Sequence, residues 1–261
     1  MRWKSQSKGL RSVFFLACVL LLPLIARSEE PFTVFFHMAN EKYDKGDFKG
    51  AITGYERIVN AGYESASVYF NLGNAFYKAG DIPSALLYYE KAHKLSPGDE
   101  DVRFNIRLAN ERTTDKIESV PEFFLTRWWT AFILSLSMQT LAFLSILLLV
   151  AGFLLLIVYL FGRSETMRRR SFYSGLTLIL IGLLSVFVAE KQDRYFASHR
   201  EGIVFAHSLE VKSAPSSVSR EVFVIHEGTK VSLAEESGGW VRIRLSNGNE
   251  GWVEASAVKT I

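Results

Sequence analysis

Residues 65–99 read SASVYFNLGNAFYKAGDIPSALLYYEKAHKLSPGD, and this stretch decides the fold of the first half of the chain. It repeats the stretch before it at an offset of 34 residues. A period of this length is typical of units built from two antiparallel helices. The matched pairs are Tyr43 and Tyr77, Gly46 and Gly80, Asp47 and Asp81, Ala51 and Ala85, Tyr55 and Tyr89, and Glu56 and Glu90. The repeat therefore predicts two stacked helical hairpins.

The second unit resembles a tetratricopeptide repeat. Small residues let its helices approach, Gly80 ends the first helix and Pro97-Gly98 ends the second. The first unit departs from the family, with Met38-Ala39 in place of Leu-Gly and Gly62 in place of Pro. The residues at the family's spacing are Leu72, Gly73, Phe76, Gly80, Ala85, Tyr89, Ala92 and Pro97.

A capping helix is expected after the second unit. Each unit buries its apolar face only against a neighbour, so two units alone would leave one face exposed. Residues 99–113 repeat the apolar pattern of the preceding unit, with Asp99 as the expected N-cap. We therefore assign residues 31–115 to a tetratricopeptide repeat domain of two repeats and a capping helix.

The resemblance implies a concave groove, lined by the first helix of each unit and by the capping helix. Asparagine amides carry both donors and an acceptor, so a row of them can pair with an extended peptide backbone while aromatic rings cover its side chains. The alternative is that Phe70 and Phe104 only pack between helices. The expected groove residues are Phe36, His37, Asn40, Tyr43, Phe70, Asn71, Asn74, Tyr77, Phe104, Asn105 and Leu108.

Three apolar runs indicate a membrane protein. The run over residues 12–26 follows a basic start and is too short to span, which predicts a signal peptide over residues 1–28 or, alternatively, an uncleaved anchor. Residues 128–162 contain no acidic or basic residue, and a polar cluster at residues 135–140 divides them. We expect transmembrane helices over residues 141–161 and 172–189.

The charges around these runs predict an orientation. The loop over residues 162–171 is rich in arginine, and the positive-inside tendency places it in the cytoplasm. Both soluble domains then face the periplasm from the bacterial inner membrane. Residues 116–140 form a juxtamembrane segment in which Trp128-Trp129 are expected at the headgroup level, where indole rings are favoured.

The region after residue 200 predicts a small β-barrel. Five strands are expected, and Asn247-Gly248 is typical of a hairpin turn. The motifs LEVKSAPS (residues 209–216), EGTKV (227–231), GGWVRI (238–243) and GWV (251–253) resemble a bacterial SH3-like domain, which we place at residues 200–261. Trp240 and Trp252 then form a ligand surface or, alternatively, complete a small core. The expected strands are residues 203–205, 222–225, 230–233, 241–245 and 251–253.

Several function classes are excluded or disfavoured. The single cysteine, Cys18, allows neither an internal disulfide nor a zinc finger. Residues 28–127 hold 12 basic against 16 acidic side chains, and the basic excess lies only beside the apolar runs, so a nucleic-acid partner is not expected. No phosphate-binding loop, metal-ligand spacing or nucleophile-base pair is recognisable. We therefore predict a binding protein without cofactors or metal, and not an enzyme.

The order of parts resembles the BatE family, the E proteins of the Bat (Bacteroides aerotolerance) operon. The likeness includes Asn71-Leu72-Gly73-Asn74 and the Trp128-Trp129 pair. It implies a multidomain fold made of an α-helical tetratricopeptide domain, a transmembrane helical hairpin and an all-β SH3-like barrel. It also implies an interaction scaffold in aerotolerance or oxidative stress, with von Willebrand A-domain Bat membrane proteins as partners. The alternative is a peptidoglycan-binding anchor acting through the SH3-like domain.

Overall fold

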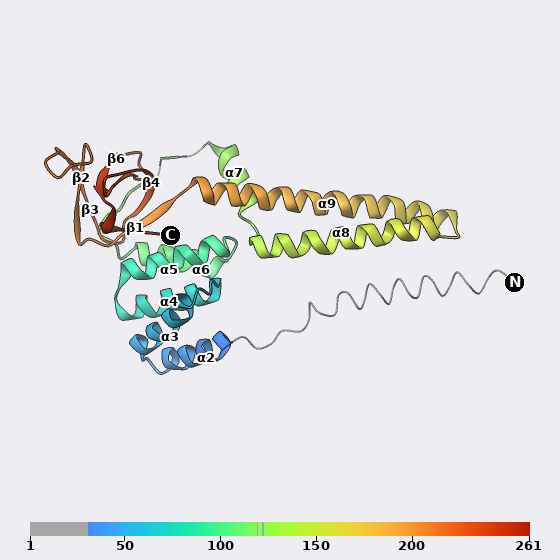
Figure 1. Cartoon of the computed structure of the whole chain (residues 1–261), viewed down its shortest axis with the longest axis horizontal. Coiled ribbons are helices and arrows are strands. Elements are labelled where there is room, and N and C mark those ends of the chain that lie inside the picture. Colours follow the sequence, from blue (N-terminus) through green and yellow to red (C-terminus); the bar gives the residue numbers. More distant parts are fainter. Residues whose placement is uncertain (1–30, 119, 122) are drawn as a thin grey trace.

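The computed structural model describes residues 31–118, 120–121 and 123–261. Two soluble domains lie together at one end, and a long helical hairpin projects from them (Figure 1). The expected fold class is confirmed: a helical tetratricopeptide-like region, two apolar helices and an antiparallel sheet domain. The signal peptide predicted over residues 1–28 lies outside the described residues.

Five helices form the tetratricopeptide region, and the same caps recur at the offset of 34 residues. The Asp47 and Asp81 side chains accept hydrogen bonds from the backbone N–H groups of Gly50 and Ser84, at 2.9 and 3.0 Å. Gly80 ends its helix in the left-handed conformation, and Asp99 caps the last helix, as predicted. The helices are α2 (Pro31–Asp44), α3 (Phe48–Asn60), α4 (Ala66–Ala79), α5 (Ile82–Leu95) and α6 (Glu100–Asn110).

The polar cluster in the second apolar run separates two helices. A short helix, α7 (Phe124–Ile133), ends before the cluster, and α8 (Met138–Phe161) begins within it, at Met138 instead of the expected residue 141, with the Ser137 side chain accepting from the backbone N–H of Thr140. The third run belongs to α9 (Glu165–Ser198), whose 34 residues make it about 50 Å long. Helix α9 is longer than the expected span because its charged ends continue the same helix.

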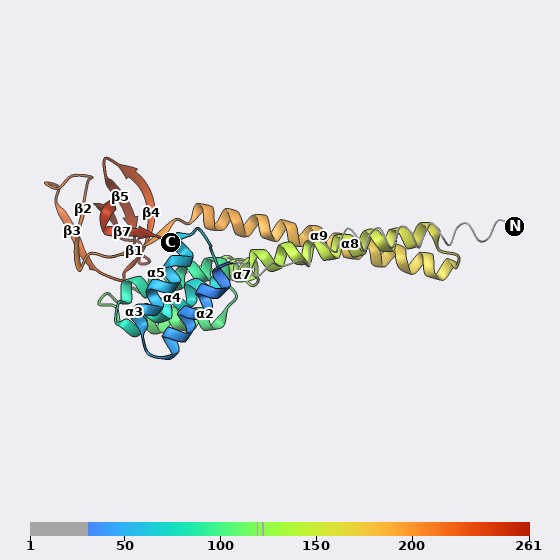
Figure 2. The same cartoon turned by 60° about the horizontal axis from the view of Figure 1, so that its bottom comes forward.

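By length and composition, α8 and α9 are long and apolar enough to cross a membrane. An 18-residue stretch of α8 has a mean hydropathy of 3.1, and one of α9 has a mean hydropathy of 2.2. The two helices lie side by side and antiparallel in both views (Figures 1 and 2). Small residues allow this contact, since a Cβ added at Gly152 would lie 2.9 Å from the carbonyl oxygen of Gly175. Both soluble domains consequently lie at the end of the hairpin opposite its 162–164 turn.

The C-terminal domain is a seven-stranded antiparallel sheet, so the expectation of five strands was wrong. The strands missed were β2 (Ser208–Lys212) and β7 (Val258–Thr260). The hairpin turn at Asn247-Gly248 is present, with Gly248 at a φ of 90°. The other strands are β1 (Glu201–Val204), β3 (Glu221–His226), β4 (Lys230–Ser237), β5 (Trp240–Arg244) and β6 (Glu250–Glu254), and the strand order is β3-β2-β6-β5-β4-β1-β7.

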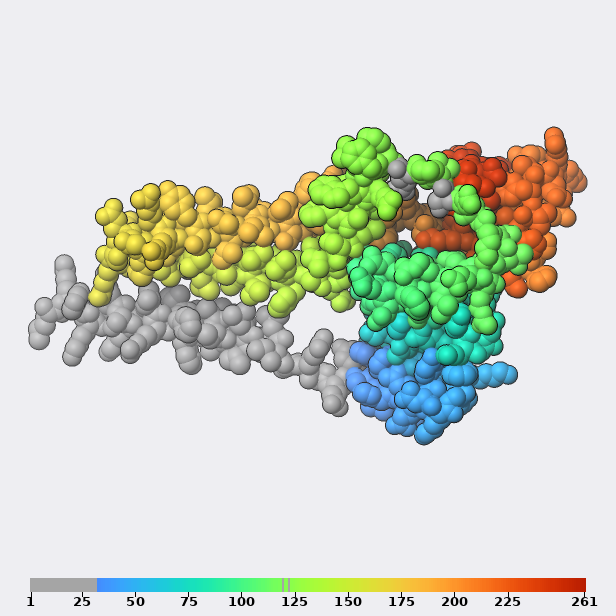
Figure 3. Space-filling view, turned by 180° about the vertical axis from the view of Figure 1, so that it is seen from behind, coloured from blue at the N-terminus to red at the C-terminus, as the bar shows by residue number. Residues whose placement is uncertain are grey.

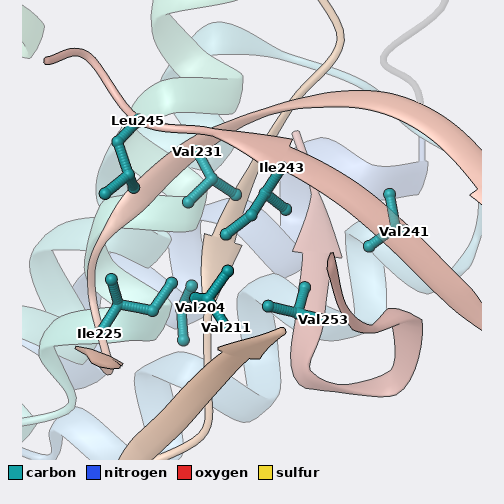
Figure 4. Packing of buried hydrophobic residues seen from close by; sticks show 8 residues of the cluster. All are labelled: Val204, Val211, Ile225, Val231, Val241, Ile243, Leu245 and Val253. Atoms are coloured by element: carbon teal, nitrogen blue, oxygen red, sulfur yellow. The ribbon is translucent and has the colours of Figure 1, made fainter. Parts of the chain in front are cut away.

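Alternating residues of these strands point inward and form the barrel core (Figure 4). Val241 and Ile243 of β5 and Val253 of β6 are buried there, whereas the residues between them lie on the outer face. The core residues are Val204, Val211, Ile225, Val231, Val241, Ile243, Leu245 and Val253.

The barrel docks on the second tetratricopeptide unit. Ile203 of β1 is fully buried in a cluster with Ala85, Leu86 and Tyr89. Beside this cluster, Lys230 Nζ lies 3.0 Å from Glu90 Oε2 and 2.8 Å from Glu201 Oε2. Burial alone would lower the pKa of Lys230, but the two carboxylates outweigh burial and raise it. The ammonium group therefore stays charged and ties the domains together.

The segment that follows α6 also joins the domains. It runs along the side of the barrel toward α7 (Figure 3). Asp115 Oδ2 accepts hydrogen bonds from the backbone N–H of His226, at 2.7 Å, and from Thr229 Oγ1, at 2.6 Å. Burial opposes ionisation of Asp115, but these hydrogen bonds outweigh it and hold its pKa below the usual value. The chain thus fastens the barrel at two separate points.

Candidate functional site

A hollow of about 250 Å³ lies between the helices of the two tetratricopeptide units. Four of the groove residues expected from the sequence line it, namely Asn40, Tyr43, Asn71 and Asn74. Asp44 and Tyr55 line it as well. The structure therefore brings the centre of the predicted groove together in one place.

Hydrogen bonds hold the asparagine amides in a ladder. Asn40 Oδ1 accepts from the Tyr55 hydroxyl, at 2.6 Å, and from Asn71 Nδ2, at 3.1 Å. The same arrangement recurs one repeat later, where Asn74 Oδ1 accepts from the Tyr89 hydroxyl and from Asn105 Nδ2, both at 2.8 Å. We call these two sets the first and second asparagine–tyrosine ladders.

The tyrosines of the ladders are buried and neutral. Burial raises the pKa of Tyr55 to about 12, and burial likewise raises the pKa of Tyr89. Each hydroxyl consequently keeps its proton and donates to its asparagine. This fixes the orientation of the amide, because the Oδ1 atom must face the hydroxyl.

The ladders leave some amide groups for a ligand. Among the described residues, no hydrogen-bond partner lies at Asn40 Nδ2 or Asn71 Oδ1. A donor and an acceptor therefore stand next to each other beside the hollow, and their positions are set by buried tyrosines. An extended peptide backbone offers the complementary acceptor and donor.

Two of the phenylalanines expected in the groove pack against other rings, and the third is exposed. The rings of Phe36 and Phe70 lie 6.0 Å from those of Tyr55 and Tyr89, so both phenylalanines pack behind the ladders. This agrees with the packing interpretation for Phe70. Phe104, by contrast, is 56% exposed.

The remaining expected groove residues lie outside the hollow. His37 is exposed and Leu108 is half-buried. The Tyr77 ring lies under the guanidinium of Arg112, at 5.0 Å. None of these three lines the hollow.

Sequence reasoning missed the role of the two tyrosine hydroxyls. Tyr55 and Tyr89 stood out only as matched positions of the repeat, and Tyr89 also as a residue at the family's spacing. Each lies 15 residues after its asparagine, Asn40 or Asn74, and this spacing is the same in both units. The recurrence of an asparagine and a tyrosine 15 residues apart in both units was therefore the signal in the sequence that could have indicated this hydrogen bond.

The two barrel tryptophans lie on the outer face of the sheet. In the register of β5 and β6, Trp252 is opposite Arg242, and Trp240 is opposite Glu254. The inward residues of these strands are Val241 and Val253. Both tryptophans are half-buried and lie outside the core cluster, so the expectation that they complete the core is not supported.

The described part of the chain contains no group of three or more His, Cys, Asp or Glu side chains arranged to hold a metal ion. His207 and His226, the two histidines of the barrel, contact carboxylates of Glu227 and Asp115. His207 thus makes a surface contact within the barrel, and His226 takes part in the docking of the segment that follows α6.

Comparisons with known proteins agree with this architecture. Residues 36–100 match the tetratricopeptide repeat family, and residues 207–259 match the bacterial SH3 domain. Both are typically non-catalytic binding domains. A search of the curated proteins finds no match. Among solved structures, a crystal structure of MamA protein is 17% identical and covers 65% of this chain and 90% of that chain, with a TM-score of 0.30.

Proposed function

We propose that this chain is an inner-membrane-anchored scaffold whose tetratricopeptide groove binds a peptide segment of a partner protein. The domain composition supports a protein-interaction role. The observation that carries the proposal is the doubled asparagine–tyrosine ladder beside the hollow. Through its likeness to BatE, we assign the scaffold to the Bat aerotolerance and stress-response system, with von Willebrand A-domain Bat membrane proteins as partners.

The ladder suits a peptide better than a small molecule. The two ladders extend from α2 across α4 to α6, so their amides are spaced from one helix to the next instead of converging on one point. Because the tyrosines fix the amides before binding, little side-chain entropy is lost when a peptide docks. Exposed Phe104 continues the surface beyond the second ladder.

Replacing Asn71 and Asn74 with alanine tests this proposal. The double variant loses amides from both ladders, so we expect co-purification of Bat partners to fall strongly. Asn60→Ala is the matched control, because Asn60 is exposed at the end of α3 and away from the hollow. Undiminished recovery of partners by the double variant, at a melting temperature close to that of the control, would contradict the proposal.

We further propose that both soluble domains face the periplasm. Support comes from the arginine-rich tip of the hairpin, which lies at the opposite end from both domains. Reporter fusions at Thr166 and at Gly238 test this orientation. We expect cytoplasmic activity from the first fusion and periplasmic activity from the second, and the reversed pattern would refute it.

A second candidate function is cell-wall binding through the barrel. The outward position of Trp240 and Trp252, beside Arg242, favours it, because aromatic faces and charged groups suit sugar and peptide ligands. Sedimentation of the full chain with purified peptidoglycan, compared with the Trp240→Ala variant, tests this function. Equal sedimentation of the two proteins would count against it.

A further inference from the structure

A second hollow, of about 430 Å³, lies between the end of the second tetratricopeptide unit and the short helix α7. At the edge of the hollow the two regions are in close contact at Gly98, because a Cβ added there would lie 2.3 Å from the carbonyl oxygen of Ser135. Figure 3 shows α7 against the base of α8, beside the tetratricopeptide helices. The polar residues that line the hollow are His93, Arg103, Arg127, Thr130 and Ser135.

This hollow lies at the level where a membrane surface would begin. Helix α7 leads directly into α8, the first helix long enough to span. Its large side chains are open to the surroundings: Phe124 is 68% exposed and Trp128 is 67% exposed. Short amphipathic helices of this kind lie in the interface between headgroups and acyl chains. The hollow is therefore beside the lipid headgroups when the hairpin is in a bilayer.

The charges that line the hollow are of one sign. Arg103 and Arg127 contribute two guanidinium groups, and none of the described lining residues is acidic. Arg127 forms no ion pair within the described residues. Arg103 has only a loose contact with Glu100, at 3.6 Å, and that carboxylate is 90% exposed. Two guanidinium groups without a firm counter-ion suit the oxygens of a phosphate group.

A buried polar atom in the same place also lacks a partner. His93 Nδ1 is buried and makes no hydrogen bond. Burial lowers the pKa of His93, so the ring is neutral at pH 7 and its nitrogen needs a donor or acceptor. The hydroxyl of Thr130 has no partner among the described residues either, whereas Ser135 Oγ donates to the carbonyl oxygen of Phe132. A phosphate in the hollow would offer acceptor oxygens to the Thr130 hydroxyl as well as to the two guanidinium groups.

We propose that this hollow binds the headgroup phosphate of an anionic membrane lipid, with Arg103 and Arg127 on the phosphate oxygens. The lipid would hold the tetratricopeptide domain down on the bilayer surface beside α7. This inference rests on the membrane placement of the hairpin that the proposed function includes, and it is independent of what the groove binds.

Native mass spectrometry of the full chain, released from nanodiscs of phosphatidylcholine with phosphatidylglycerol, tests the site. We expect the wild-type chain to retain phosphatidylglycerol in preference to phosphatidylcholine. The Arg103→Gln/Arg127→Gln variant should lose about tenfold in that retention, because it lacks two charge-assisted contacts. Arg220→Gln is the matched control, since Arg220 is exposed in the loop between β2 and β3, far from the hairpin. This control should behave as the wild type.

Each other outcome overturns a defined part of the proposal. Equal retention by the double variant, in discs that it enters normally, contradicts the site alone. Displacement of the lipid by millimolar inorganic phosphate contradicts a lipid source and identifies free phosphate as the ligand. Failure of the wild-type chain to enter the discs contradicts the membrane placement itself. Partner recovery through the groove should be unchanged in the double variant, because neither arginine lines the groove hollow.

Discussion

The two tetratricopeptide units share one pattern but place the glycine that permits close packing on opposite helices. In the first unit, a Cβ added at Gly54 of α3 would lie 2.8 Å from the Cβ of Ala39 in α2. In the second unit, a Cβ added at Gly73 of α4 would lie 2.6 Å from the Tyr89 ring of α5. The departure of the first unit from the family pattern is thus compensated within that unit. A single glycine where the two helices of a unit cross is enough for them to approach closely.

The units differ also on their outer faces. Glu56 and Glu90 occupy equivalent positions of the repeat. Glu90 is 6% exposed and binds Lys230 of the barrel, whereas Glu56 has no ion-pair partner among the described residues. Within the described part of the chain, the same residue is therefore a half-buried side chain without an ion pair in one unit and a docking contact in the other.

Charge reversal at these two glutamates gives the largest expected difference. Glu90→Lys places two cations together at the buried interface, so we expect a loss of about 3 kcal/mol and release of the barrel from α5. Glu56→Lys should change stability by less than about 1 kcal/mol, because Glu56 is only half-buried and has no ion pair to lose among the described residues. Melting temperature and proteolysis of the segment between α6 and α7 measure both effects. Equal behaviour of the two variants would refute the docking contact.

Adding a Cβ tests the exchange of glycine between units. We expect Gly73→Ala to cost about 2 kcal/mol, because the aromatic ring of Tyr89 cannot move away easily. Gly54→Ala should be destabilising as well, and the second change Ala39→Gly should restore much of the loss by moving the glycine to the other helix. Thermal unfolding of the four proteins decides this. Absence of rescue in the double variant would show that the two crossings are not equivalent.

Removing the ladder hydroxyls should give a smaller effect. Tyr55→Phe and Tyr89→Phe each remove one hydrogen bond to an asparagine Oδ1 atom, with an expected cost of about 1 kcal/mol. The two values should be similar, because the two ladders have the same geometry. Chemical denaturation of each variant measures them, and a negligible cost in both would mean that the hydroxyls do not hold the amides.

The smallest expected effect is a dependence of stability on alkaline pH. Burial raises the pKa of Tyr55 to about 12 in the folded protein, above its ordinary value of about 10. The stabilisation is complete below pH 10 and is lost as the pH rises toward 12, because only the unfolded chain ionises readily in that range. At pH 10 the loss should be below about 1 kcal/mol. Tyr55→Phe should reduce this pH dependence, and Tyr69 and Tyr89, whose pKa values burial also raises, should keep the rest. An unchanged profile would contradict a buried neutral hydroxyl at Tyr55.

Local features of the fold were predictable from the sequence. The caps at Asp47 and Asp81, the helix end at Gly80 and the turn at Asn247-Gly248 depend on a few neighbouring residues, and all are present. The break before α8 was also visible, because the polar cluster there interrupts an apolar run.

Features that depend on distant residues were not predictable. Strands β2 and β7 are short and lie among serine and alanine residues; β2 pairs with the next strand, β3, across a loop of eight residues, and β7 pairs with β1, which is remote in sequence. The ion pair between Lys230 and Glu90 joins residues 140 positions apart, and no local sequence pattern predicts it. The groove was predicted by position, but the tyrosine hydroxyls that fix its amides became visible only in the folded structure.

Photo-crosslinking in cells tests most directly whether the groove holds the partner protein. A photoreactive residue at Asp44, which lines the groove hollow, should give adducts larger than the 29.5 kDa chain. The same residue at Val218, which is 92% exposed on the barrel, should give none, whereas a residue at Trp240 reports on the barrel's outer face. Adducts from Asp44 alone are the predicted result. Protein adducts from Trp240 without any from Asp44 would contradict the account.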